Sequence, residues 1–286
     1  MKIGLIVTVY NRVRYLENVL KMIAHQTLVP YEVIIADDGS VENVKGLLEN
    51  YKNELKCKIK HVYQEDKGFR KSRSCNNAVI ESESDYLIFI DQDLVFPESM
   101  LDVFRKNIKR KYFTMLRVYW SSSDEAEHIQ QCIDVKGGYC LPRTADNFFN
   151  RLDVQKNIIK DRYNNMRFSC RLRDRGAGLQ GIGFGLFKND YLRVNGYDEA
   201  YEGWGGEDAD LGLRLYYSGL SSCSITTNPI PIHLHHPLDP TKNSTRKNNL
   251  SLYKEKKINV VAGGYICHYG ILNRKDDDEY SVSKIS

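Results

Sequence analysis

The sequence predicts a single α/β domain built on a doubly wound, mainly parallel sheet. Short runs rich in apolar and β-branched residues are typical of buried strands, and helical patterns separate them. The resulting β-α-β-α-β-α-β order favours a parallel sheet, because parallel strands need crossover connections. Ligands of such sheets bind at the carboxyl ends of the strands, so the polar residues that follow each strand are the first candidates for a site.

The first hundred residues carry this regular pattern. Strands are predicted at Ile3–Val9, Glu32–Ala36, Ile59–Tyr63 and Tyr86–Ile90. Apolar residues recur at helical spacing between them, which predicts helices over Tyr15–Ala24, Val44–Tyr51 and Ser72–Glu81. The second strand ends at a strong turn signal, Asp37-Asp38-Gly39-Ser40.

The second half is less regular. Between about residues 112 and 175 the sequence places no elements, and a Gly-rich segment follows at 181–185. A helix is predicted over Ala209–Tyr217, with Gly219 as its C-terminal stop. The Lys-, Asn- and Ser-rich end of the chain contains an acidic cluster at 276–279, which is expected to be solvated and frayed. We therefore expect a catalytic domain over 1–245 and a C-terminal tail over 246–286.

Composition narrows the class of protein. The 286 residues are 42% hydrophobic and carry a net charge of +4, an excess too small to indicate a nucleic-acid partner. The seven cysteines include no C-x-x-C pair, which argues against a disulfide framework or a zinc knuckle. No apolar stretch approaches the ~20 residues that span a bilayer. We expect a cytoplasmic protein, with peripheral contact to the inner face of a membrane left open.

Two acidic motifs could carry chemistry. Asp91 and Asp93 follow the strand Tyr86–Ile90, where two carboxylates can share a divalent cation with a diphosphate. Taken alone, such a pair is also common in surface turns. The segment 203–210, GWGGEDAD, places Glu207 and Asp208 in the first turn of a helix, where a carboxylate could act as a general base. Its bland interpretation is a glycine turn with ordinary N-terminal acids and a core tryptophan.

Three further segments each allow a functional and a purely structural interpretation. His233, His235 and His236 could include a metal ligand or could be packing and surface histidines. The basic run 67–73 could hold phosphates or could be an exposed helix start. Asp38 could accept a hydrogen bond from a nucleobase, although a turn requires Asp at this place anyway.

Together these segments resemble the family 2 glycosyltransferases. The matching pieces are VTVYNRVRYL (7–16), EVIIADDGS (32–40), DKGFRKSRSCNNA (66–78), DYLIFIDQD (85–93) and GYDEAYEGWGGEDADLGLRL (196–215). The second half also looks like β-1,4-galactosyltransferases and bacterial chondroitin polymerases, which have a similar GWGGED signature. The resemblance covers roughly 1–100 and 178–240 and implies a GT-A fold, with a nucleotide-binding half over 1–100 and an acceptor-binding half over 176–240.

The resemblance also implies roles for individual residues. Asp208 would be the catalytic base. The acceptor sugar would be held by Trp204, Gly205 and Glu207, and the metal by Asp93, His236 and, more weakly, His233. The nucleotide and its diphosphate would contact Thr8, Tyr10, Arg12, Asp38, Phe69, Arg73 and Asp91. Where many members have a GxN-type sequence near the donor pocket, this chain has Gly181-Ile182-Gly183, so the donor sugar is not indicated.

The implied function is transfer of a hexose or N-acetylhexosamine from a UDP-sugar to a saccharide hydroxyl, with inversion and with Mn²⁺ or Mg²⁺ as cofactor. Members of the family commonly take part in surface polysaccharide biosynthesis and act on a lipid-linked acceptor, so the resemblance also implies these two features. Two other classes stay open: a sugar nucleotidyltransferase, and a non-catalytic carbohydrate-binding protein on the same fold. The first would normally have a Gly-rich basic loop after its first strand, where this chain has VTVYNR.

Overall fold

The computed structural model describes residues 1–136, 148–237 and 242–286. In chain order its elements are β1 (Ile3–Val9), α1 (Val13–Ala24), β2 (Glu32–Asp37), α2 (Val44–Tyr51), β3 (Lys58–Gln64), α3 (Lys71–Glu81), β4 (Tyr86–Asp91), β5 (Leu94–Val95), α4 (Met100–Lys106), β6 (Tyr112–Leu116), β7 (Tyr119–Trp120), α5 (Ser123–Lys136), α6 (Phe148–Ser169), β8 (Gly183–Phe187), α7 (Lys188–Arg193), α8 (Glu207–Tyr217), β9 (Ser221–Ile225), β10 (Ile232–His233), α9 (Lys242–Val261) and β11 (Tyr280–Lys284). No helix among these residues is long and apolar enough to cross a membrane.

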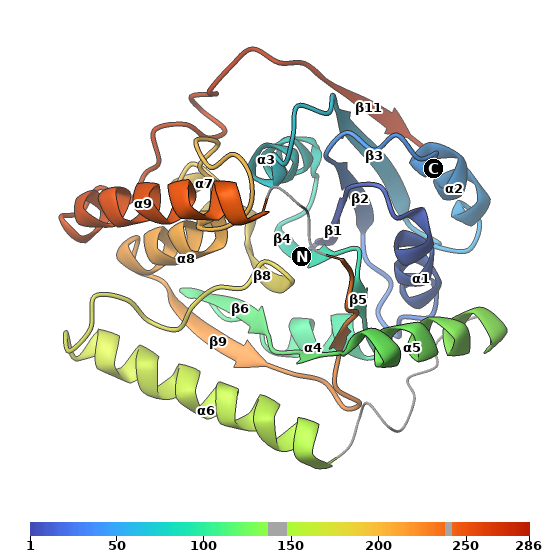
Figure 1. Ribbon diagram of the computed structural model, residues 1–286, viewed down its shortest axis with the longest axis horizontal. Helices are drawn as coiled ribbons and strands as arrows, with labels where there is room; N and C mark the ends of the chain where they lie inside the picture. The colour runs from blue at the N-terminus through green and yellow to red at the C-terminus, as the bar shows by residue number, and fades with distance from the viewer. Residues whose placement is uncertain (137–147, 238–241) are drawn as a thin grey trace.

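One eight-stranded sheet organises the molecule (Figure 1). Its strand order is β11-β3-β2-β1-β4-β8-β6-β9, and β1 to β4 run parallel to one another. β8 runs antiparallel to both β4 and β6, which joins the second half of the chain to the first. The mainly parallel α/β fold predicted from the strand and helix alternation is therefore confirmed.

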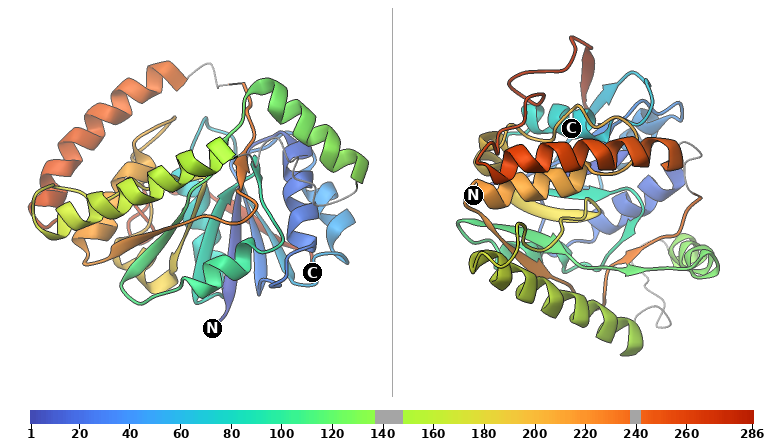
Figure 2. Two further views of the ribbon diagram at one scale, coloured as in Figure 1. Left: turned by 90° about the horizontal axis from the view of Figure 1, so that it is seen from below. Right: turned by 60° about the vertical axis from the view of Figure 1, so that its left-hand side comes forward.

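Helices cover both faces of this sheet (Figure 2). One core cluster joins the strands to α1, α2, α4 and α5, and a second joins their opposite side chains to α3, α7 and α8. Alternate residues of β1 show the division, since Leu5 belongs to the first cluster and Ile6 to the second. Burial on both faces explains why β1, β2 and β4 consist mostly of apolar residues.

The C-terminal segment differs from the expectation of a frayed tail. α9 packs on α8, and β11 pairs antiparallel with β3 at the edge of the main sheet. In the acidic cluster, the Asp278 carboxylate accepts from Lys67 Nζ at 2.6 Å and from Arg70 Nη1 at 2.7 Å. The segment after residue 245 is thus part of the fold, held by the basic run that it faces.

The pairing of β11 predicts a measurable contribution to stability. Ile285 follows this strand and is buried in the first core cluster. We expect Ile285→Ala to lower the free energy of unfolding by about 2 kcal/mol, because it removes a buried side chain. Val282→Ala, at a half-exposed position of the same strand, should cost less than half as much. Urea denaturation of both variants makes the comparison. Wild-type stability for Ile285→Ala would show that this strand does not dock in solution.

Candidate functional site

A cavity of about 680 Å³ opens at the carboxyl edge of the parallel strands. Its walls come from the loops that follow β1, β2 and β4, from the start of α3 and α8, and from the segments around β7 and β10. The sequence-predicted residues that line it are Thr8, Tyr10, Arg12, Asp38, Phe69, Asp91, Asp93, Trp204, Glu207, Asp208, His233 and His236. Motifs far apart in the chain therefore meet in one chamber.

Asp91 lies at the end of β4 in the floor of the cavity. Its Oδ1 accepts hydrogen bonds from the Thr8 hydroxyl and from Lys71 Nζ, both at 2.6 Å. Burial raises the pKa of Asp91, which Lys71 partly offsets. For Lys71, burial opposes the charged form, but the carboxylates of Asp91 and Asp208 raise its pKa above the ordinary value. This part of the floor thus holds a permanent positive charge beside the acids.

Asp93 forms the centre of a second cluster. Its Oδ2 lies 3.1 Å from His236 Nε2 and 3.6 Å from Arg12 Nη1, and its Oδ1 lies 3.5 Å from His233 Nε2. Burial alone would raise the pKa of Asp93, but the hydrogen bond from His236 and the charges of His233, His236 and Arg12 hold it below its usual range. Within the described residues, Asp93, His233 and His236 bring one ligand atom each to within 4.8 Å of one another.

This cluster suits a divalent cation. The Oδ1 atom of Asp93 is buried and has no hydrogen-bond partner among the residues that the structure describes. One carboxylate oxygen and two imidazole nitrogens form a donor set typical of Mn²⁺ or Zn²⁺ sites, and a bound cation would satisfy the unpaired oxygen. His235 also lines the cavity but does not belong to this group within the described residues, so the structure groups with Asp93 the two histidines that the resemblance implied as ligands.

A small three-stranded sheet holds the cluster together. β10 pairs antiparallel with β5, which places His233 opposite Leu94, and parallel with β7, which places His233 opposite Trp120. The Leu234 N–H donates to the Asp93 carbonyl at 2.9 Å. The Trp120 and His233 rings lie 4.1 Å apart between centroids. Backbone pairing, rather than side-chain contacts alone, therefore fixes Asp93 beside the histidines.

Asp208 occupies the wall formed by the first turn of α8. Its Oδ1 accepts the Tyr197 hydroxyl at 2.7 Å, and its Oδ2 accepts the Gly181 N–H at 2.9 Å. A Cβ at position 181 would lie 2.5 Å from this carboxylate, so only glycine allows the backbone to approach so closely. Each oxygen retains a further lone pair for a substrate proton.

Glu207 precedes Asp208 and is buried against the cavity. Burial, reinforced by the neighbouring charge of Asp208, raises the pKa of Glu207 to about 8. Its Oε2 has no partner within the described chain. The helix reaches this geometry through its N-cap, Gly206, which has a φ of 97° that a side chain would strain. A protonated Glu207 can donate a hydrogen bond to a ligand at neutral pH.

Asp38 lies in the turn after β2. Its Oδ1 accepts from Gln64 Nε2 at 2.6 Å and its Oδ2 accepts from the Arg70 N–H at 2.7 Å. Burial is the main reason that its pKa rises from 3.8 to about 7, although both hydrogen bonds and the charge of Arg70 oppose the rise. The carboxyl group is thus held rigidly at the edge of the cavity.

Two of the sequence-predicted residues do not line the cavity. Arg73 pairs instead with Glu199 at 3.2 Å and with Asp276 at 2.8 Å. Lys71, two residues earlier in the chain, lines the cavity where Arg73 was expected. Two positions differ by ~200° around a helix, so the start of α3 at Lys71 decides which basic side chain faces inward. Gly205 is also absent from the lining and contributes a positive φ of 102° to the loop before α8.

Several lining residues were not singled out from the sequence. Lys71 lies in the recognised basic run and therefore had a local signal. Tyr197 does not line the cavity but orients Asp208, and it lies in the matched segment 196–215. Trp120, Ser121 and Gln180 also line the cavity. These residues lie outside the recognised motifs, and no pattern in the sequence indicates that they reach the cavity.

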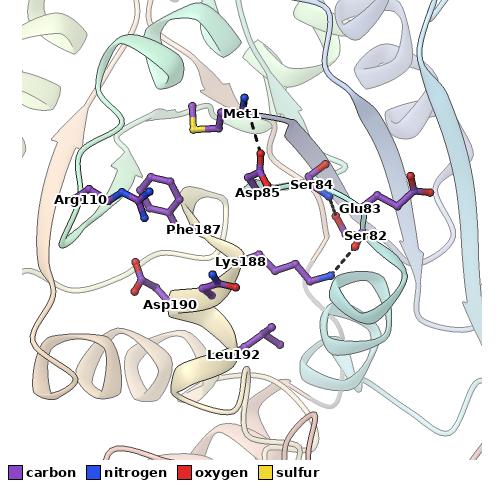
Figure 3. A pocket seen from close by; sticks show the side chains of 11 residues that line it. Met1, Ser82, Glu83, Ser84, Asp85, Arg110, Phe187, Lys188, Asp190 and Leu192 are labelled. Atoms are coloured by element: carbon purple, nitrogen blue, oxygen red, sulfur yellow. Dashed lines mark hydrogen bonds and ion pairs between the residues drawn. The ribbon is translucent and has the colours of Figure 1, made fainter.

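A second cavity, of about 730 Å³, lies at the other end of β4 (Figure 3). It is formed by the loop before this strand, by Arg110 and by residues at the junction of β8 and α7. Lys188 Nζ donates to the Ser82 carbonyl at 2.6 Å, and the Arg110 guanidinium lies 4.6 Å from the centroid of the Phe187 ring. None of the sequence-predicted site residues lines this cavity.

Comparisons with known proteins agree with this architecture. Residues 5–171 match the model of glycosyl transferase family 2, and residues 163–237 match the galactosyltransferase model described as its N-terminal domain. The validoxylamine A glucosyltransferase of Streptomyces hygroscopicus subsp. limoneus is 24% identical, over 76% of this chain and 48% of the relative. The chondroitin synthase of Pasteurella multocida (strain Pm70) is 27% identical, over 76% of this chain and 23% of the relative. This chain therefore spans half or less of the length of these relatives.

Solved structures show the same fold at low identity. Residues 1–349 of S. aureus TarS, solved in complex with UDP-GlcNAc, superpose with a TM-score of 0.59 at 14% identity, over 95% of this chain and 69% of that one. The mannosyltransferase PcManGT from Pyrobaculum calidifontis, in complex with GDP-Man and Mn²⁺, gives 0.55 at 14% identity, over 90% and 64%. Because the family model matches more than half of its residues, this chain belongs to glycosyl transferase family 2.

Proposed function

We propose that this chain is an inverting glycosyltransferase that moves a hexose or N-acetylhexosamine from a UDP-sugar to a saccharide hydroxyl. The observation that carries the proposal is the meeting of Asp38, Asp93 and Asp208, from three separate motifs, in one cavity at the strand ends. Family membership and the similarity to UDP-GlcNAc-bound TarS support it. The chondroitin synthase relative supports a place in surface polysaccharide biosynthesis.

The donor would lie across the ends of β1, β2 and β4. Asp38 would accept a hydrogen bond from the base, and Phe69 and Tyr10 would contact the nucleoside. Lys71 and Arg12 supply positive charge that suits a diphosphate. Asp91, fixed by Thr8 and Lys71, would lie near the ribose and the donor sugar.

The cation would be held by Asp93, His233 and His236. Bound there, Mn²⁺ or Mg²⁺ would neutralise the negative charge that develops on the departing diphosphate. Mn²⁺ suits the two imidazole ligands better than Mg²⁺, which prefers oxygen.

The acceptor would enter beside α8. Trp204 offers an apolar face to a sugar ring, and Glu207 offers a hydrogen bond to a hydroxyl. Asp208, oriented by Tyr197 and Gly181, would accept the proton of the attacking hydroxyl. A bond forms between the acceptor oxygen and the anomeric carbon as the bond from that carbon to the UDP oxygen breaks, with inversion.

The acceptor could be carried by a lipid, which would bring the protein to the inner face of a membrane. The similarity to a chondroitin synthase supports a saccharide acceptor of this kind. It concerns the identity of the acceptor and leaves the chemistry at Asp208 unchanged.

The first test is ligand binding. UDP, GDP, CMP and dTDP are added singly, with and without Mn²⁺, and thermal unfolding is followed together with calorimetry. A ligand at ~100 times its Kd should stabilise the protein by about 2.7 kcal/mol. Selective stabilisation by UDP that Mn²⁺ enhances would support the donor site. Equal responses to all four nucleotides, or none, would contradict it.

Substitution of the proposed base separates chemistry from binding. Asp208→Asn should lower kcat by about 10²-fold or more, because the amide cannot accept the proton of the acceptor. UDP affinity should change little. Transfer assays and calorimetry provide the two readings, with Asp277→Asn, at an exposed position, as the matched control. Turnover near that of the wild type would remove Asp208 from the mechanism.

The metal assignment has its own paired test. Asp93→Ala should abolish the gain in UDP affinity that Mn²⁺ provides, because it removes the carboxylate from the group that Asp93 forms with His233 and His236. His235→Ala should keep that gain, since His235 lines the same cavity outside the group. Calorimetric titration of UDP with and without Mn²⁺ measures both. The opposite pattern would move the metal away from Asp93.

Asp38 predicts a pH dependence of stability. Its pKa is near 3.8 when unfolded and about 7 when folded, so the folded state keeps the proton longer. The stabilisation from this protonation is complete below pH ~4 and is lost as the pH rises through 7, by up to about 1.4 kcal/mol per pH unit. Asp38→Asn should remove this loss, so the variant gains stability relative to the wild type between pH 4 and 7. Urea denaturation across this range measures it, and parallel profiles would contradict the raised pKa.

A further inference from the structure

The outer face of α6 carries apolar and basic side chains together. The helix runs along the outside of the molecule beside β9, as Figures 1 and 2 show. On its inner side, Val154 and Ile158 are buried with Ile230 and pack on Tyr119. Asp161 accepts from Arg117 Nε at 2.6 Å. These contacts account for how the helix is attached and leave its opposite side facing outward.

Four large apolar side chains form a stripe on that opposite side. They are Leu152, Ile159, Tyr163 and Met166, exposed by 38%, 62%, 54% and 55%. Their spacing of seven, four and three residues places them on one face of a helix. The stripe extends for ~20 Å along the axis, at 1.5 Å per residue. Exposed large apolar side chains aligned on one helix face in this way mark an interaction surface rather than scattered surface residues.

Basic residues border the stripe. Lys156 and Lys160 lie along one edge and Arg162 along the other at helical spacing, and α6 as a whole has five basic and two acidic residues. One of those acids, Asp161, is buried and paired with Arg117, and the other, Asp153, pairs with Lys156 at 3.2 Å. In the part of the chain that the structure describes, no carboxylate lies within ion-pair distance of Lys160 or Arg162. The outer face of α6 is therefore both apolar and cationic.

We propose that the outer face of α6 docks on the surface of an anionic lipid bilayer. The apolar stripe would enter the boundary between headgroups and acyl chains, while the flanking lysines and arginines contact lipid phosphates. A second copy of this chain is a poorer occupant, because antiparallel or parallel pairing of the same face would bring its basic borders together. The basic residues beside the stripe are complementary to anionic lipid and not to a second copy of the same face, which favours the bilayer as the partner.

The location of α6 gives the docking a consequence for the cavity. Tyr119 packs against the inner side of the helix, and its neighbour Trp120 lines the cavity. The docking face is therefore one helix removed from a cavity wall, so a docked molecule holds its cavity near the lipid headgroups. The use of this position for a lipid-linked acceptor rests on the proposed function, whereas docking itself does not.

Vesicle binding tests the inference. The intact chain is sedimented with vesicles of phosphatidylcholine alone and of phosphatidylcholine mixed equally with phosphatidylglycerol. We expect binding to the mixed vesicles alone, and its loss in high salt. The double substitution Lys160→Gln with Arg162→Gln should weaken partitioning by roughly 30-fold, at about five-fold per charge. Ile159→Glu should abolish it.

The matched control is Ile258→Glu, at a position on α9 that is 76% exposed. This variant should bind vesicles as the wild type does. Thermal unfolding and the UDP response of every variant establish that the fold and the cavity are intact, which separates this result from the proposed function. Wild-type protein that ignores anionic vesicles, or equal binding by Ile159→Glu, would overturn the proposal. So would a lipid-free wild-type dimer that Ile159→Glu converts to a monomer, because the stripe would then be covered by a second copy.

Discussion

The buried carboxylate of Asp93 is the constraint around which the rest of the site is arranged. A buried charge must be paired, because desolvation otherwise costs several kcal/mol. Its partners come from distant parts of the chain: Arg12 follows β1, His233 ends β10, and His236 follows β10. The small sheet of β5, β10 and β7 joins the segment after Asp93 to the segment that carries the two histidines by backbone hydrogen bonds. The nucleotide-binding half and the second half of the fold are thus held together at the position of the buried Asp93 carboxylate.

The parts of the fold that the sequence predicts are those with a single, uniform environment. β1, β2 and β4 are buried on both faces, so their apolar composition distinguishes them, and β1 has the predicted bounds Ile3–Val9. Most of the candidate residues follow from one rule, that parallel strands bring their carboxyl ends to the same edge. Asp38, Asp91 and Asp93 meet in one cavity for this reason.

The parts that the sequence does not predict depend on partners distant in the chain. α6 has apolar residues on both its inner and outer sides, so no amphipathic pattern marks it within 112–175. Asp276 and Asp278 are consistent with a solvated cluster until Arg70 and Arg73 are placed opposite them. Lys71 and Arg73 are both basic residues of the same run. The position at which α3 begins directs Lys71 toward the cavity and Arg73 toward the C-terminal segment. A sequence pattern gives the residue types, whereas the positions of these side chains depend on which distant segments they contact in the fold.

The antiparallel pairing of β4 with β8 has a consequence for how the molecule assembles. β1 to β4 and their helices are contiguous in the chain and can associate locally, but one side of β4 then remains an open strand edge. That edge is apolar along its length and is covered only when β8 arrives, nearly a hundred residues later. Until then it offers unpaired amide and carbonyl groups to any other chain. Closing this seam is therefore also the step that protects the folding chain from aggregation.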